Sequence, residues 1–170
     1  SDYRFRVADS GAISTTGGIA LGTSTPATSG IGVQFPATQS ASSDANTLDD
    51  YEEGTWTPTL KNASSSSTFT QNTGRYTKIG RLVYCSFVTD SGNTGTAGSD
   101  ITLSGLPFAY GGTSNVPTLV SFTGNGIPAA VNCYLSRTIN GSTSFVVRDA
   151  AGNALTNQLT FAAGTIVYEV

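Results

Sequence analysis

Arg81–Asp90, with the sequence RLVYCSFVTD, decides the fold class of this chain. Its polarity alternates, and it is rich in β-branched and aromatic residues, which indicates a β-strand. Similar runs follow along the chain, with glycine- and asparagine-rich turn signals between them. The expected strands are Thr55–Leu60, Arg75–Ile79, Arg81–Asp90, Asp100–Leu106, Val116–Thr123, Ala129–Thr138, Thr143–Asp149, Gln158–Ala162 and Thr165–Val170.

These strands predict an all-β fold, because no window of useful length has the periodicity of a helix. About nine short strands at this spacing favour a jelly-roll-like antiparallel β-sandwich over residues 55–170. Asn140-Gly141 is the clearest two-residue hairpin turn, and Ala163-Gly164 is expected to separate the last two strands. The last strand runs to Val170, so we expect the C-terminus to be paired within a sheet.

Residues 1–41 differ in composition from the region of strands. They are rich in Gly, Ser, Thr and Ala, with single aliphatic residues spaced among them. Too few apolar residues lie here for a self-contained core. We therefore expect an extended, intertwined fibre-like segment, in which several copies bury these side chains along a shared axis. A flexible Ser/Gly linker is the alternative.

Residues 42–54 form an acidic connector between the two regions. Asp44 is expected to cap a short helical turn over Asn46–Asp50, which Gly54 would end. Five of the eleven carboxylates fall within ten residues, namely Asp44, Asp49, Asp50, Glu52 and Glu53. An EF-hand spacing is absent, and paired catalytic carboxylates usually come from different strands. A solvated or salt-bridged surface is therefore favoured over a calcium or glycosidase site.

Basic residues follow the connector closely, and the two can lie against each other within one chain or between neighbouring chains. They are Lys61, Arg75, Lys78 and Arg81, half of the eight basic residues of the protein.

Composition argues against several classes of function. Hydrophobic residues make up 38% of the chain and the net charge is only −3, which is not the pattern of a disordered protein. Nucleic-acid binding needs a basic face, so nucleic acid is not an expected partner. No apolar run approaches the ~18 residues of a membrane span, so no membrane insertion is expected. Histidine is absent, and no other base stands beside a nucleophile, so we expect no enzyme activity, no metal and no cofactor.

The two cysteines, Cys85 and Cys133, each lie in an alternating apolar run. Free thiols that act as small buried hydrophobic residues are favoured. A disulfide is the alternative, and it requires the two strands to be close.

Hydroxyl and amide side chains dominate the polar residues, which suits a surface that binds neutral glycans. Tyr110, beside a glycine loop, is the preferred exposed aromatic residue, with Asn115 nearby and Asn125 in a separate turn. Tyr134 is a weaker candidate, since its strand face can be core or an ordinary solvent face. Trp56, the only Trp, can stack on a sugar, but packing at the entrance of the domain is favoured.

Four blocks of sequence carry a resemblance to a known family. They are GIGVQFPATQ at 30–39, SSDANTLDDYEEGTWTP at 42–58, GRYTKIGR at 74–81 and LSGLPF at 103–108. In this order they resemble a segment of bacteriophage and prophage tail fibre and tailspike proteins that leads into a small C-terminal β domain. The resemblance spans roughly residues 30–108. Residues 109–170 resemble no family, and a receptor-binding surface is expected to diverge there.

The resemblance implies a homotrimeric tip of a fibre in the virion tail, assembled in the cytoplasm of the bacterial host. It implies a polysaccharide of the host surface as the ligand. A structural cap that holds the trimer together without a ligand is one alternative, and a fragment of a glycan-degrading tailspike is another. The family defines no catalytic residue in this segment.

Overall fold

The computed structural model describes residues 5–7, 13–15, 17–22, 24–25, 28–38, 42–44, 46–62, 68–94, 100–112, 118–125, 134–136, 141–148, 153 and 158–170. The chain divides into two compact units, Ser1–Glu52 and Glu53–Val170. The boundary falls within the expected acidic connector, one residue before Gly54.

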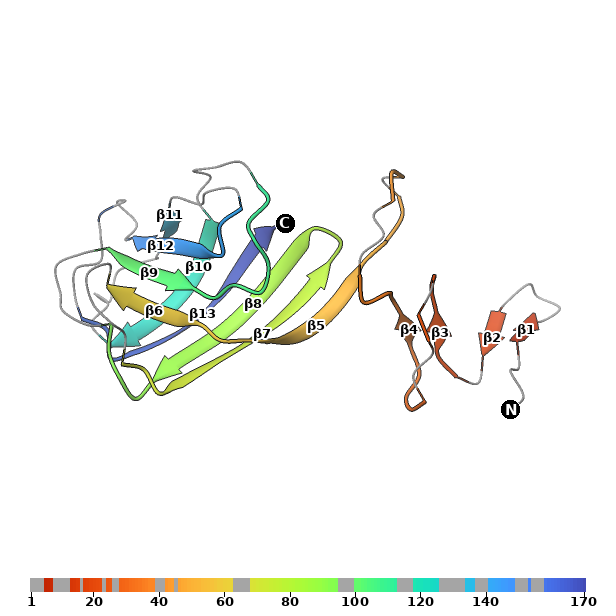
Figure 1. Cartoon of the computed structure of the whole chain (residues 1–170), viewed down its shortest axis with the longest axis horizontal. Helices are drawn as coiled ribbons and strands as arrows, with labels where there is room; N and C mark the ends of the chain where they lie inside the picture. Colours follow the sequence, from red (N-terminus) through yellow and green to blue (C-terminus); the bar gives the residue numbers. More distant parts are fainter. Residues whose placement is uncertain are drawn as a thin grey trace. The chain divides into compact units, whose positions relative to one another are not determined.

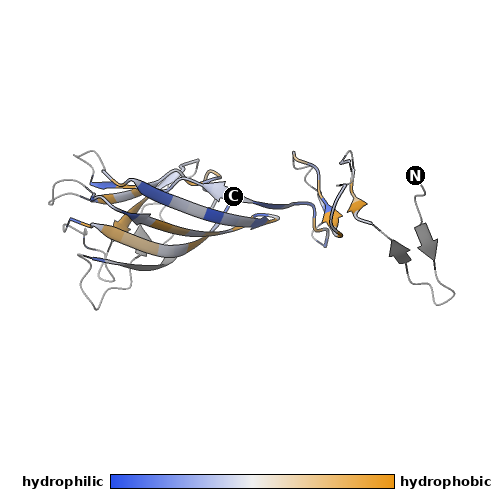
Figure 2. Cartoon of the chain, turned by 90° about the horizontal axis from the view of Figure 1, so that it is seen from below, coloured by the Kyte–Doolittle hydropathy of each residue, from blue (hydrophilic) through white to orange (hydrophobic). Residues whose placement is uncertain are grey.

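The N-terminal unit contains two small sheets. Strand β1 (Phe5–Val7) pairs antiparallel with β2 (Ile13–Thr15), and β3 (Ile19–Ala20) pairs parallel with β4 (Val33–Gln34). Figure 2 shows the hydrophobic residues of β3 and β4 in orange. Among the residues of this unit whose side-chain burial is described, no hydrophobic one is buried. Instead, five large hydrophobic residues besides Tyr51 are exposed, namely Ile19, Leu21, Ile31, Val33 and Leu48.

The expected helical turn in the acidic connector is wrong, because the described residues 46–50 contain no helix. Asp44 instead closes a single turn. Its side chain accepts a hydrogen bond from the backbone N–H of Asn46 at 2.8 Å, and its carbonyl accepts one from Thr47 at 3.1 Å. An Asp side chain that binds the backbone in this way stabilises a turn as readily as it caps a helix. Gly54 lies inside a strand and ends no helix.

The C-terminal unit is a β-sandwich, and the predicted all-β, jelly-roll-like antiparallel sandwich is confirmed (Figure 1). One sheet has the order β5-β7-β8-β13-β10 and the other continues as β10-β11-β12-β9-β6. The strands are β5 (Tyr51–Trp56), β6 (Thr59–Asn62), β7 (Gln71–Ile79), β8 (Leu82–Asp90), β9 (Ile101–Ser104), β10 (Thr118–Asn125), β11 (Tyr134–Ser136), β12 (Ser144–Arg148) and β13 (Phe161–Glu169).

The chain passes between the two layers at two places. Strand β10 pairs with β11 through Thr118 and Leu119, then with β13 through Val120–Asn125. At the other side, β5 and β6 belong to different layers and are separated by Thr57 and Pro58. Proline has no N–H to donate to a ladder, so a strand that reaches Pro58 breaks there. The single expected strand Thr55–Leu60 is therefore two strands.

Strand β13 is one continuous strand, so the turn expected at Ala163-Gly164 is wrong. Gly164 pairs with Phe87 of β8 on one side and with Phe122 of β10 on the other. Pairing on both sides holds the glycine in the sheet, which the local sequence cannot signal. The C-terminal strand is paired as expected, and it lies inside its sheet, between β8 and β10. Strands β11 and β12 pair antiparallel, with Ser136 opposite Val146, as expected for two strands joined by a hairpin. The two-residue turn predicted at Asn140-Gly141 stays a prediction, because Asn140 lies outside the described residues.

The core lies between the two layers, and its described members run from Trp56 onward. Strand β8 contributes Val83, Cys85 and Phe87, and Phe145 of β12 packs edge-on against Tyr168 of β13, with ring centroids 5.8 Å apart. The other buried hydrophobic residues are Leu60, Phe69, Ile101, Leu103, Leu106, Tyr110, Val147, Leu159, Ala162 and Ile166. In the described part of each sheet, one face is buried against the other layer. The residues on the opposite face therefore decide which surface is free to bind a partner.

Candidate binding surface

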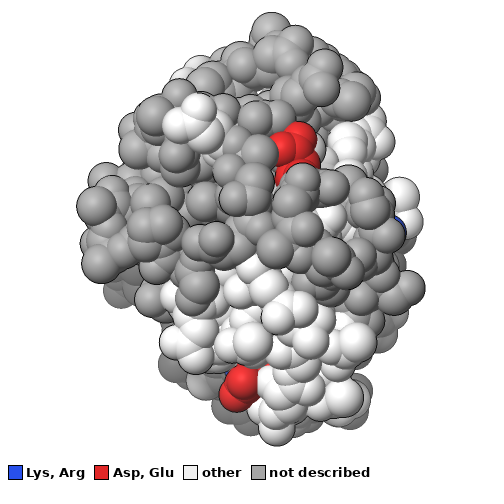
Figure 3. Space-filling view, turned by 90° about the vertical axis from the view of Figure 1, so that its left-hand side faces the viewer, with Lys and Arg blue, Asp and Glu red and all other residues white. Residues whose placement is uncertain are grey.

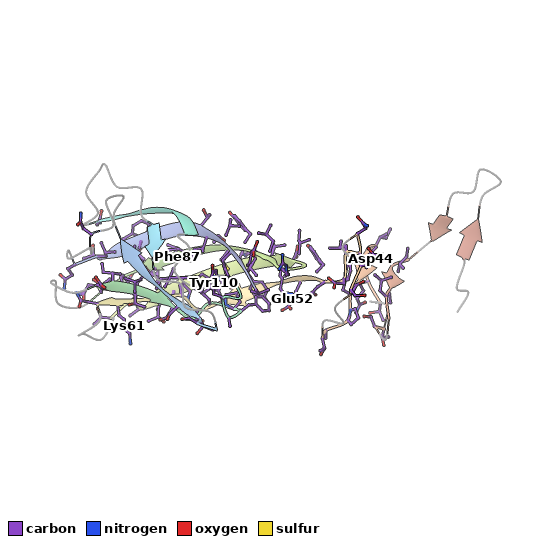
Figure 4. The ribbon with its side chains drawn as sticks, turned by 90° about the horizontal axis from the view of Figure 1, so that it is seen from above. Asp44, Glu52, Lys61, Phe87 and Tyr110 are labelled. Carbon is purple, nitrogen blue, oxygen red and sulfur yellow. The ribbon has the colours of Figure 1, made fainter. Side chains whose placement is uncertain are left out.

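Tyr110 is buried, so the prediction of an exposed aromatic residue is wrong. It is 5% exposed, and its ring packs edge-on against Phe145 at 6.0 Å. Its backbone accepts a hydrogen bond from Gly141 at 2.7 Å and donates one to Ser142 at 2.8 Å. Figure 4 shows its side chain within the sandwich, together with that of Phe87. A ring that is covered on all sides cannot stack on a sugar.

Trp56 is also part of the core, which confirms the favoured packing interpretation. It is 6% exposed, its Nε1–H donates to the carbonyl of Ser86 at 3.2 Å, and its ring meets Phe87 at 6.0 Å. A Cβ at Gly74 would overlap the indole, so only glycine leaves room for this ring. The role of Trp56 is therefore to hold β5 against β7 and β8.

The remaining predicted residues are only partly described. Asn125 ends β10 opposite Phe161 and is exposed, as a residue that contacts a ligand must be. Tyr134 begins β11 and pairs with Leu119 and Arg148, but its side chain lies outside the described part. Asn115 lies outside the described residues, as does Cys133. Their binding roles stay predictions.

The acidic connector and the basic residues have several described contacts. Asp49 accepts a hydrogen bond from the backbone of Ser42 at 2.7 Å, and Asp50 is buried. Among the basic residues, Lys78 is buried, with its Nζ 5.5 Å from the centroid of the Phe108 ring. This is a cation–π contact, which stabilises an ammonium group out of water. In the described residues, no group of three or more Cys, Asp or Glu side chains could hold a metal ion.

A buried polar network lies at the centre of the core. Cys85 is a free thiol, as predicted, and it hydrogen-bonds to Tyr168. The hydroxyl of Tyr168 donates to the carbonyl of Phe108 at 3.1 Å and accepts from its N–H at 3.3 Å. Burial raises the pKa of the Cys85 thiol to about 12, and burial also raises the pKa of Tyr168. Both groups stay protonated at neutral pH, so the thiol is not a nucleophile there.

The outer face of the first sheet carries a surface that the sequence analysis missed. Strand β8 alternates between buried residues and exposed ones, and the exposed ones are also apolar. Together with residues of β7 and β13 they form a set that we call the apolar face, namely Ile79, Leu82, Tyr84, Val88 and Val167. The sequence of β8 already indicated this surface, because its apolar residues fall on both faces of the strand. Such a pattern is typical of a sheet that is covered on both sides.

The second sheet has no such surface in its described part. On β6, β9 and β12, the large hydrophobic residues that are described point into the core or are only partly exposed. The outward positions there are mostly Thr, Ser and Lys, for example Lys61, Thr102 and Ser144.

Comparison with protein-family models, curated proteins and solved structures finds no significant match to this chain. No helix in the described residues is long and apolar enough to cross a membrane.

Proposed function

We propose that this chain is the distal part of a bacteriophage tail fibre or tailspike, assembled as a homotrimer, whose sandwich binds a polysaccharide of the bacterial surface. The four sequence blocks that resemble such proteins support the family. The observation that carries the proposal is the N-terminal unit, which buries no described hydrophobic side chain and leaves Ile31 86% exposed. Single aliphatic residues on an extended segment are stable when copies of the chain cover one another.

The end of the sandwich shown in Figure 3 supports a neutral ligand. Its described surface is mostly uncharged, with two small acidic areas and almost no Lys or Arg. Neutral sugars are recognised by hydroxyl and amide groups, which serve as both donors and acceptors. An anionic ligand such as nucleic acid would require basic side chains instead.

A structural trimer cap without a ligand is the second candidate. It is favoured by the burial of Tyr110 and Trp56, because two of the three aromatic residues that the sequence offered for sugar contact are occupied in the core. If the cap is the whole function, the trimer forms but no polysaccharide binds.

The test uses the purified chain. We expect light scattering at micromolar concentration to give a trimer, and immobilised capsular and O-antigen polysaccharides from a panel of bacteria to include one that binds. Binding should change little between low and physiological salt, because the contacts are not ion pairs. We expect no release of reducing ends from the bound polysaccharide. A monomer would contradict the fibre assignment, and a trimer that binds no polysaccharide would favour the cap.

A further inference from the structure

We propose that the apolar face, formed by Ile79, Leu82, Tyr84, Val88 and Val167, is the surface on which copies of this chain pack against one another. The number of copies rests on the proposed trimer, but the surface is argued from the sandwich alone.

The five side chains are close together because of the strand register. Ile79 is paired with Leu82 across the β7–β8 hairpin, and Tyr84 is paired with Val167 of β13. Val88 lies farther along β8, beyond Ser86. Residues two apart on a strand point to the same side, so these residues lie on one side of the sheet.

The exposed apolar area is enough for part of an interface between two copies. With ordinary side-chain areas, the five residues expose roughly 450 Å², about the largest apolar patch of a typical monomer. A stable interface buries about 800 Å² on each partner, so this patch provides about half of one. Outward hydroxyl residues on the same strands can provide the rest, namely Thr73, Thr77, Ser86 and Thr165.

The chemistry of the face fits protein better than sugar. Four of its five members are aliphatic, and aliphatic side chains offer a sugar neither a ring to stack on nor a hydrogen bond. Tyr84 is the one residue that could serve both, at 46% exposure in the middle strand. Protein interfaces are enriched in tyrosine, because its ring packs against apolar side chains while its hydroxyl can still hydrogen-bond to water.

The charges around the face suit a second copy. Arg75 pairs with Ser86 in the middle of the sheet, whereas Asp90 and Glu169 lie toward its opposite ends. Arg81, which is exposed in the turn before β8, adds a second basic position at the end that carries Glu169. Charges of both signs therefore border the face, and two copies can be placed with unlike charges opposite each other. A basic partner or an anionic membrane would find no such match. A second copy of this chain is therefore the occupant that we assign.

The experiment compares two valine substitutions in the full chain. Val167→Lys places a charge on the apolar face, and Val146→Lys places the same charge on the outer side of β12 in the other sheet. We expect sedimentation velocity to show dissociation of Val167→Lys, with at least about a tenfold loss of affinity between copies, and no change for Val146→Lys. Far-UV circular dichroism establishes that each variant folds, and Val167→Thr, which adds no charge, should weaken assembly less.

The outcomes separate this inference from the proposed function. A wild-type chain that is monomeric overturns the proposed trimer. A trimeric wild type whose Val167→Lys variant stays fully assembled overturns the inference alone, and so does equal dissociation of both lysine variants. If Tyr84→Ala keeps the trimer but loses polysaccharide binding, the face is a sugar site and the inference is wrong.

Discussion

Both faces of strand β8 carry large apolar residues, but only the inner face is covered within the chain. Val83, Cys85 and Phe87 point inward and are buried against the second layer. Leu82, Tyr84 and Val88 alternate with them along the same strand and are exposed. A sheet that has to be soluble alone needs only one apolar face. A strand that is apolar on both sides indicates a sheet that is covered on both faces. We infer that the second layer of the same chain covers the inner face and that another copy of the chain covers the outer face.

The two faces should respond differently to substitution. An inner residue should affect the folding of the single chain, whereas an outer residue should affect assembly and leave the fold intact. Each of the following changes tests that difference.

The largest effect is expected from Phe87→Ala on the inner face. Removal of a buried ring between Trp56 and the second layer leaves a cavity, and such substitutions cost about 3–5 kcal/mol of the free energy of unfolding. Chemical denaturation followed by Trp56 fluorescence measures this loss. A change below about 1 kcal/mol would contradict the described core.

A loss of stability at alkaline pH is expected next, from two groups on the inner face. Burial raises the pKa values of Cys85 and Tyr168 in the folded chain, while the unfolded thiol and phenol ionise near their ordinary pKa values of 9.0 and 10.0. The unfolded state therefore loses protons first, so stability is complete below pH 9 and falls as the pH rises through 9 toward 12. Thermal unfolding between pH 7 and pH 11 measures this.

Cys85→Ala provides the matching control for the alkaline effect, since it removes one of the two groups. Its melting temperature should fall less steeply with pH above 9 than that of the wild type. Identical slopes would mean that other groups govern the alkaline loss.

Tyr168→Phe should have a smaller effect, about 1–3 kcal/mol. The hydroxyl of Tyr168 both donates to and accepts from the backbone of Phe108, and its removal leaves buried polar groups without this partner. Equilibrium denaturation of the variant measures the loss. Tyr84→Phe is the control, because it removes the hydroxyl of an exposed tyrosine from the neighbouring strand and should cost little.

The smallest effect on folding is expected from Leu82→Thr on the outer face, within about 0.5 kcal/mol for the single chain. Leu82 lies in a pair with Ile79 next to the Gly80 turn, and threonine is well tolerated in strands. Denaturation of the dissociated chain measures its stability, and light scattering of the same variant should show weaker assembly. A large loss of stability in the dissociated chain would mean that Leu82 belongs to the core.

The fold was predictable because its signals are local. Alternation in RLVYCSFVTD and the glycine turn at position 141 place strands without reference to the rest of the chain. Gly164 was mistaken for a turn because its two partner strands come from distant parts of the sequence. Pro58 was missed for a similar reason. The expected single strand Thr55–Leu60 is divided there, and its two parts belong to different layers of the sandwich.

The candidate site was less predictable, because burial of an aromatic residue depends on distant neighbours. Tyr110 stands beside glycines, which suggests an exposed loop, but residues more than thirty positions away hold its backbone and cover its ring. The apolar face could have been noticed, since Leu82, Tyr84 and Val88 are themselves apolar. Alternation was instead interpreted as one buried and one polar face, which fits the second sheet but not the first.

The most direct measurement is hydroxyl-radical footprinting of the intact chain, with the modified residues located by mass spectrometry. Tyr84 and Val167 are 46% and 43% exposed in the single chain, so both should react readily unless another copy covers them. We expect protection of both residues in the assembled chain and loss of that protection on dilution. If Tyr84 and Val167 react in the assembled chain as fast as they do after dissociation, the outer face of β8 is not where the copies meet.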